Sequence, residues 1–269
     1  MFRFLRGTGG ERVFRATILS ALALLTLFFV GVVLSALTYT HFSTFISALV
    51  SREILFAIRL SLATATLSAI ISILIAIPVA YAISQTRFPG KYIVDTVLDL
   101  PIVISPIALG ACLLIFFNTP VGAAVNSNLI NFVFNVPGIV LAQFTIVSAL
   151  AVRLLKSTFD NIDPRYEQVG RTLGYGKAEV FLRVTLPLAK DGVIAAIILT
   201  WARAVGEFGA TVTLAGATTM KTETLPVAIF LSLSSADVEK AVAVIFVLIA
   251  ISIIALFTIR YLVGRKYLI

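Results

Sequence analysis

The sequence is poor in the residues from which proteins build metal and redox sites. It contains one cysteine and one histidine in 269 residues. The single Cys112 cannot form an intrachain disulfide, and one cysteine with one histidine does not supply the usual soft ligands of a metal site. We therefore expect no metal, no cofactor and no disulfide in this chain.

Charge is also scarce. Only 13% of the residues are Asp, Glu, Lys or Arg, whereas soluble domains carry about 25%. Apolar residues make up 59% and the mean hydropathy is +1.06, so a water-soluble globule of this composition would lack the polar surface to cover itself. A soluble enzyme, a secreted scaffold, a disordered tail and a fibrous protein are excluded, and the composition predicts an integral membrane protein.

Long uncharged runs define the predicted spans. A membrane-spanning helix needs about 20 mostly apolar residues, and the longest run without Asp, Glu, Lys or Arg covers residues 100–152. Asn, Pro and Gly near residues 118–138 indicate turns that divide this run. The sequence predicts an all-α integral membrane protein, with a single transmembrane domain over residues 1–269. Its six predicted helices lie at about 16–39, 55–84, 93–117, 138–155, 192–216 and 241–262.

The basic residues indicate how these helices are oriented. The net charge of +8 is also typical of nucleic-acid-binding proteins, but in a multi-pass protein Lys and Arg gather in the cytoplasmic loops. With the N-terminus inside, sixteen of the 21 Lys and Arg fall on the cytoplasmic side. The sequence therefore predicts that both termini are cytoplasmic, that the chain lies in a lipid bilayer, and that no nucleic acid is bound.

The polar segment 159–187 is the one long loop on the predicted cytoplasmic side. Asp163 is placed to cap a helix whose first residue is Pro164. Gly174 supplies a natural C-terminal stop. A second short helical stretch is predicted over residues 177–183. The segment is therefore predicted to form a helix, a glycine turn and a second helix beneath the membrane.

The first of these helices is amphipathic. Tyr166, Val169 and Leu173 fall on one face at helical spacing. The residues alone leave two interpretations equally open. Either the helix packs on lipid headgroups, or it is a docking element presented to a cytoplasmic partner.

The same segment carries a family resemblance. The stretch YEQVGRTLG at residues 166–174, followed after nine residues by VTLP at 184–187, resembles the EAA loop of ABC importer permeases. The family pattern is Glu-Ala-Ala, three residues, Gly, nine residues and Ile-x-Leu-Pro. Here the glycine and the Leu-Pro pair match in register. The triplet differs, because Gln168, Val169 and Gly170 stand in place of Glu-Ala-Ala, and a glutamate, Glu167, comes one position earlier.

Two further stretches resemble the sulfate, molybdate and tungstate branch of that family. One is RFPGK at residues 87–91, which leads to LDLP at 98–101. The other is WARAVGEFGAT at 201–211, followed by TETLPVAI at 222–229. Together with the EAA-like loop, the resemblance covers the chain from about residue 55 to its end.

The resemblance implies a type I ABC importer in the cytoplasmic membrane of a prokaryote. Such an importer has two permease subunits, two cytoplasmic ATPase subunits and an extracytoplasmic oxyanion-binding protein. The EAA segment is then a coupling helix seated in a groove of the ATPase, which binds ATP and Mg²⁺. Because this chain has no Walker-type phosphate loop, it is a transport subunit and not an enzyme.

The resemblance also implies which residues dock on the ATPase subunit. Docking needs an apolar face with a polar rim, and the first helix of the loop offers both. The expected docking residues are Asp163, Arg165, Tyr166, Glu167, Gln168, Val169, Gly170, Arg171, Leu173 and Gly174.

Charges and helix breakers within the spans are the pathway or gate candidates. Arg203 and Glu207 lie four residues apart and can pair along one helix face. Charges at membrane depth face a bundle interior or an aqueous cavity, so the pair either locks helices together or lines the translocation pathway. Prolines, among them Pro106, and Gly110 interrupt the predicted helices as hinges, as cavity-lining positions or as fixed bends.

The predicted function is therefore that of a permease subunit that imports a small oxyanion, with molybdate or tungstate favoured. A homodimer of this one permease suits molybdate. A sulfate or thiosulfate ABC permease is the alternative. An ion-coupled secondary transporter is a third, which would have inverted repeats and a carboxylate near the midplane. No repeat is apparent, although Glu207 resembles such a carboxylate.

Overall fold

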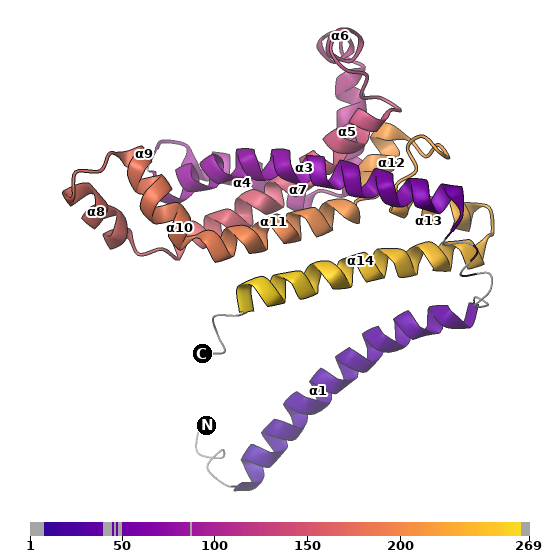
Figure 1. Ribbon diagram of the computed structural model, residues 1–269, viewed down its shortest axis with the longest axis horizontal. Helices are drawn as coiled ribbons and strands as arrows, with labels where there is room; N and C mark the ends of the chain where they lie inside the picture. The colour runs from indigo at the N-terminus through magenta and orange to yellow at the C-terminus, as the bar shows by residue number, and fades with distance from the viewer. Residues whose placement is uncertain (1–7, 40–44, 46, 48–49, 87, 265–269) are drawn as a thin grey trace.

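The computed structural model describes the chain except for residues 1–7, 40–44, 46, 48–49, 87 and 265–269 (Figure 1). The described residues form helices and contain no strand, which confirms the predicted all-α class. The elements are α1 (Thr8–Ser35), η1 (Ala36–Tyr39), α3 (Arg52–Gln85), α4 (Lys91–Val103), α5 (Pro106–Phe117), α6 (Pro120–Asn128), α7 (Val136–Asp160), α8 (Pro164–Thr172), α9 (Lys177–Val180), η2 (Phe181–Thr185), α10 (Leu186–Leu188), α11 (Lys190–Val205), α12 (Gly209–Ala215), α13 (Leu225–Ser234) and α14 (Val238–Gly264).

Four of these helices, α1, α3, α7 and α14, are long and apolar enough to cross a membrane alone. Two pairs, α4–α5 and α11–α12, reach that length only together, and they are bent by 110° and 55°. If each bent pair counts as one span, the described residues hold six spans. This is the predicted number, but the third and fifth spans are broken helices.

The spans predicted over 93–117 and 192–216 each consist of two helices, and Pro106, one of the predicted interruptions, lies at the break in the third span. The third span breaks at Ile104 and Ser105, and Pro106 begins α5. A proline ring has no N–H to bond the preceding turn, so it favours a helix start at this position. Not every proline breaks its helix, because Pro78 and Pro101 lie inside continuous stretches of α3 and α4.

Two helices were not predicted. α6 lies in the stretch interpreted as turns, and its start is capped by Thr119, whose Oγ1 accepts the Gly122 N–H at 3.2 Å. α13 lies in the predicted loop before the last span. At ten residues it is too short to cross a membrane. Its first turn is nevertheless buried, and the Leu225 N–H donates to Ser61 Oγ on α3 at 2.7 Å.

The core is the contact of α3 with α7, which α11 covers (Figure 1). In lipid there is little hydrophobic drive between helices, so small residues that let backbones approach, together with hydrogen bonds, hold them together. Ser68 Oγ donates to Gln143 Oε1 on α7 at 3.0 Å. The small buried residues of α3 are Ala57, Ser61, Ala65, Ser68, Ala69, Ser72, Ala76 and Ala80.

The outer helices differ in how they are attached. α14 packs along α11 and α13. α1 lies apart from the bundle (Figure 1), and its side chains from Glu11 to Ser35 are exposed. The first predicted span is therefore present as a helix, but it adds nothing to the core of this chain.

Gly110 allows α5 and α12 to touch, which gives a test of the fold. A Cβ at Gly110 would lie 2.9 Å from the Ala210 Cα and 2.8 Å from the Thr213 Cβ. We expect Gly110→Val to lower stability by roughly 1–3 kcal/mol, because the crowded backbone has to shift. Thermal unfolding in detergent measures the loss. Gly31→Val on α1 is the control, since the described atoms leave the space within 4 Å of that position open. Equal melting of the two variants would contradict this packing.

Candidate functional site

The segment from α8 to α10 forms one end of the bundle, opposite α13 (Figure 1). The start of α8 is capped as predicted, because Asp163 Oδ1 accepts the Arg165 N–H at 2.9 Å. Beyond its end, Gly174 has a φ of +91°, which glycine adopts without strain. The Tyr175 N–H then donates to the Gly170 carbonyl at 3.2 Å. With both ends fixed, α8 is a short stiff rod.

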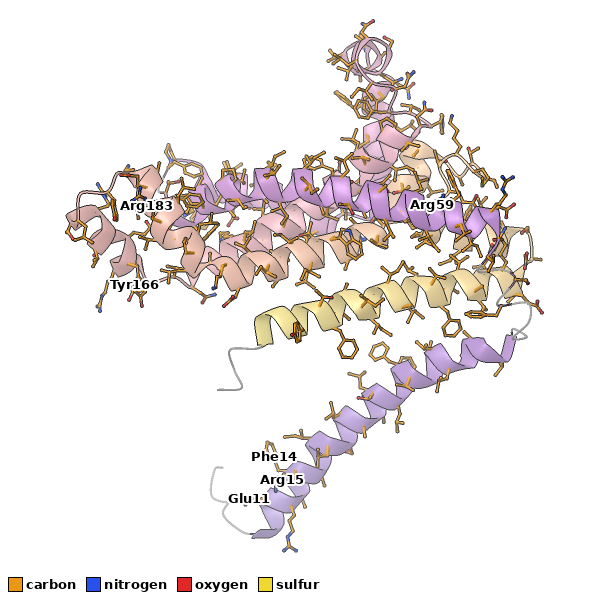
Figure 2. The ribbon with its side chains drawn as sticks, viewed as in Figure 1. Glu11, Phe14, Arg15, Arg59, Tyr166 and Arg183 are labelled. Carbon is orange, nitrogen blue, oxygen red and sulfur yellow. The ribbon has the colours of Figure 1, made fainter. Side chains whose placement is uncertain are left out.

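One face of α8 is apolar and exposed. Tyr166 is 55% exposed, Val169 58% and Leu173 71%, and Figure 2 shows Tyr166 at the far end of the bundle from Arg59. Apolar side chains grouped in this way outside a membrane span are typical of a surface that a partner covers. The polar residues around them are exposed as well, namely Arg165, Gln168 and Arg171.

Two residues of the predicted docking surface face the bundle instead. Glu167 Oε1 accepts hydrogen bonds from Thr185 Oγ1 at 2.6 Å and from the Tyr81 hydroxyl at 3.3 Å. Gly170 is buried, and a Cβ there would lie 3.1 Å from Val180 Cγ2. Residues three apart share a helix face, and this face of α8 packs on η2. Glu167 and Gly170 therefore face the bundle in this structure, and their docking on a partner stays a prediction.

The second predicted helix of the segment, 177–183, is also different. α9 ends at Val180, and the chain continues as one π-helical turn, η2, in which the Leu186 N–H donates to the Phe181 carbonyl. Such π-turns occur frequently at functional sites. Thr185 is the last residue of this turn; its side chain is buried and its Oγ1 donates to Glu167. The consequence is a polar contact between α8 and the helix that leads into α11.

A second candidate region lies where the two broken spans meet. The α4–α5 break and the α11–α12 break are adjacent, since a Cβ at Gly209 would lie 2.9 Å from the Pro106 Cβ. A cavity of about 270 Å³ lies at this junction, lined by residues 105–107, Arg203 and residues 206–209. Pro106 lines it as predicted, whereas Gly110 does not and serves the contact of α5 with α12.

Arg203 and Glu207 form the predicted ion pair at this cavity. The Arg203 Nη1 lies 2.7 Å from Glu207 Oε2, and Glu207 is 1% exposed while Arg203 is 39% exposed. α11 ends before Glu207. The Glu207 Oε1 accepts the Ala210 N–H at 3.1 Å, at the start of α12. The pair therefore holds the broken span together and also places a guanidinium in the wall of the cavity.

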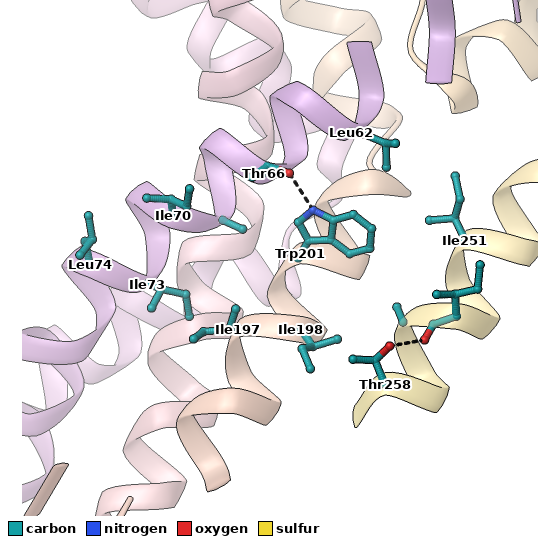
Figure 3. A pocket seen from close by; sticks show the side chains of 13 residues that line it. Leu62, Thr66, Ile70, Ile73, Leu74, Ile197, Ile198, Trp201, Ile251 and Thr258 are labelled. Carbon is teal, nitrogen blue, oxygen red and sulfur yellow. Dashed lines mark hydrogen bonds between the residues drawn. The ribbon is translucent and has the colours of Figure 1, made fainter. Parts of the chain in front are cut away.

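A larger groove lies elsewhere on the bundle (Figure 3). It has a volume of about 600 Å³ and is lined by α3, α11 and α14. Trp201 Nε1 donates to Thr66 Oγ1 at 3.0 Å on its wall. None of its lining residues is charged, so it offers an anion no basic side chain.

Tyr81 and Thr185 are functional candidates that sequence reasoning missed. Tyr81 is 86 residues from Glu167 in the chain, and Thr185 is 18 residues away. An aromatic residue in an apolar run and a threonine before Leu-Pro carry no pattern that pairs them with a carboxylate. The one sequence feature that pointed to this contact was Glu167 itself, which stands one position before the place of the glutamate in the EAA pattern.

The described residues thus form a bundle with several candidate membrane spans, an amphipathic rod at one end and two broken spans that meet. Residues 72–266 match the family described as "Binding-protein-dependent transport system inner membrane component". The match covers more than half of the chain, and the chain belongs to this family.

Relatives and a solved structure agree with that assignment. The chain is 35% identical over 247 residues to a Haloferax volcanii protein named "Probable molybdenum ABC transporter permease protein", covering 88% of this chain and 89% of the relative. It is 36% identical over 186 residues to the "Sulfate transport system permease protein CysW" of Synechococcus elongatus, covering 68% and 65%. A chain of a bacterial alginate ABC transporter shares the fold, with a TM-score of 0.75, 18% identity and 98% coverage of both chains.

The ion pair predicts a difference between two arginines. Arg203→Ala leaves the buried Glu207 carboxylate without its cation, so stability should fall by roughly 2 kcal/mol, less than the ~3–5 kcal/mol of a fully buried pair because Arg203 is partly exposed. Arg59→Ala, at an exposed position on α3, should change little. Thermal unfolding and transport both report the difference. Adding Glu207→Gln to Arg203→Ala should restore part of the stability. Equal and negligible losses would show that the pair does not hold the junction.

Proposed function

We propose that this chain is the permease subunit of an ATP-driven importer of a small oxyanion, with molybdate or tungstate as the favoured substrate. The observation that carries the proposal is α8, a capped rod whose apolar face is exposed at one end of a membrane bundle. Membership in a binding-protein-dependent transport family supports it. The molybdenum relative supports the substrate, because it aligns with this chain over nearly the whole length of both proteins.

In this proposal α8 docks on a cytoplasmic ATPase subunit. Tyr166, Val169 and Leu173 bury their exposed apolar surface there, with Gln168 and Arg171 at the rim. ATP and Mg²⁺ bind the ATPase, and closure of its two copies moves α8. Because α8 packs on α9 and η2, and η2 leads through α10 into α11, the displacement reaches a broken span.

The junction of the broken spans is the proposed passage for the anion. Each break leaves a short helix that can change its angle without unfolding the rest of the span. The Arg203 guanidinium in the cavity wall favours a negative solute. Glu207, which neutralises this arginine in the described state, keeps the site from holding the anion tightly. A route that releases its solute needs weak binding of this kind.

The distribution of basic residues supports an orientation of the chain in the membrane, and that orientation places its partners. The α8 end is rich in basic residues, which favours the cytoplasmic side for this end and for both termini. The opposite end then faces an extracytoplasmic oxyanion-binding protein. A second copy of this chain completes the pathway as a homodimer in the cytoplasmic membrane of a prokaryote. The basic residues from the end of α7 to the first residue of α11 are Arg165, Arg171, Lys177, Arg183 and Lys190.

Sulfate is the second candidate substrate, because a sulfate permease is also a relative. That relative aligns over less of both chains than the molybdenum relative does, so sulfate is less favoured. An ion-coupled carrier is disfavoured by membership in a binding-protein-dependent family. Glu207, its candidate carboxylate, is already bound to Arg203 and to the Ala210 N–H.

Reconstitution tests the function. The chain, its ATPase subunit and its binding protein are placed in proteoliposomes, and uptake of labelled molybdate, tungstate and sulfate is measured. We expect uptake that requires ATP and the binding protein and that vanadate inhibits. Empty vesicles and an ATPase subunit with an inactivated Walker lysine are the controls. Uptake driven by an ion gradient without ATP would overturn the proposal.

The docking surface gives a further prediction. Arg171→Glu reverses a charge on the rim of α8, and Gly174→Pro is incompatible with a φ of +91°. We expect each to lower ATP-driven uptake about tenfold, the effect of losing roughly 1.4 kcal/mol of coupling, with the membrane bundle still folded. Lys221→Glu, an exposed charge reversal between α12 and α13, is the control. Wild-type uptake by both α8 variants would mean that this segment does not couple ATPase to permease.

A further inference from the structure

Glu167 makes a contact that docking on an ATPase does not explain. Its carboxylate is half-buried on the inner side of α8 and accepts two hydroxyl hydrogen bonds. Thr185, on η2, donates to Oε1 at 2.6 Å. Tyr81, on α3, lies 3.3 Å from Oε1 and 3.4 Å from Oε2. One side chain therefore joins three separate elements of the chain.

The hydroxyl groups that hold Glu167 are themselves fixed. The Tyr81 ring lies 4.6 Å from the Phe181 ring and 5.8 Å from the Phe159 ring, centroid to centroid. Phe159 is fully buried on α7, and Thr185 is fully buried on η2. Neither donor can follow a displaced carboxylate without moving its own helix. A movement of α8 is thus transmitted through this contact.

Of the two elements that Glu167 contacts, α3 is long and apolar enough to cross the bilayer, and η2 leads through α10 into α11. α3 has 34 residues, a length of roughly 50 Å at ~1.5 Å per residue. Without Glu167, α8 would be attached to the bundle mainly by its packing on α9 and η2. Hydrogen bonds to a charged acceptor are stronger than neutral ones. A carboxylate at this position is a firmer link than packing alone.

We propose that Glu167 is the positioning residue that ties the coupling helix to α3 and η2, so that α8 moves α3 and, through η2 and α10, α11 together. This rests on the proposed function. Gln168, the next residue, is exposed on the side available to a partner. In this proposal the two adjacent residues face different partners: Glu167 contacts the bundle and Gln168 contacts the ATPase.

The first experiment measures oxyanion uptake per ATP hydrolysed in the reconstituted complex. We expect Glu167→Ala to lower this ratio about tenfold, the effect of losing hydrogen bonds to a charged group, while the ATPase subunit still co-purifies. Glu167→Gln keeps an amide oxygen that accepts hydroxyl hydrogen bonds, so it should retain more of the ratio. Glu11→Ala, which removes an exposed carboxylate on α1, is the matched control and should leave the ratio unchanged.

A double-mutant cycle tests the partner. Tyr81→Phe removes the hydroxyl and keeps the ring, so it should also lower the ratio. Combined with Glu167→Ala it should cause no further loss, because both changes break one contact. Fully additive losses would show that Tyr81 and Glu167 act separately and would overturn the link to α3.

The second experiment needs no transport. In a Cys112→Ser background, spin labels are attached at Thr86→Cys beyond α3 and Thr172→Cys on α8, in the full complex. We expect a narrow distance distribution that broadens with Glu167→Ala and stays narrow with Glu11→Ala. If the unsubstituted complex does not import with ATP, the proposed function fails, and the label distances still decide the link. If Glu167→Ala keeps both the wild-type ratio and the narrow distribution, or only loses the ATPase subunit, the positioning role is wrong.

Discussion

The close contact between α3 and α7 is the interaction on which the other parts depend. Serine and alanine on the buried side of α3 bring the two backbones together, and Ser68 bonds Gln143 across the contact. α3 then carries a fixed point at each end. Ser61 holds the first N–H of α13, and Tyr81 holds the carboxylate of α8. A continuous helix packed in this way can link the two ends of the bundle.

The broken spans are arranged around that rigid centre. In a membrane each unpaired backbone group is costly, so a helix break is tolerated only where protein groups satisfy it. Glu207 does so for the α11–α12 break, since it accepts the Ala210 N–H and pairs with Arg203. The same device leaves a charged cavity inside an otherwise apolar bundle. The helix breaks and this charged cavity thus lie in one place, which is the proposed translocation route.

The sequence predicted these features unevenly. The helix cap at Asp163, the turn at Gly174 and the ion pair of Arg203 with Glu207 are local, and each was recognised from spacing. The sequence predicted that prolines interrupt the third span but not which of them breaks it, because Pro101 continues its helix while Pro106 begins a new one. Both prolines lie in apolar sequence. Their difference depends on a neighbour, α12, whose Gly209 admits the Pro106 ring beside the break.

By itself, the sequence determined what depends on composition and on residues near one another in the chain: an integral membrane protein, six apolar spans, an amphipathic capped rod, and resemblance to ABC importer permeases. Only the tertiary structure decided which face of that rod is covered. Glu167 and Gly170 lie within one helical turn of the exposed residues, so periodicity cannot separate them sharply from the rim. Their environment is set by Tyr81, Val180 and Thr185. Such contacts arise when helices pack, and no local pattern records them.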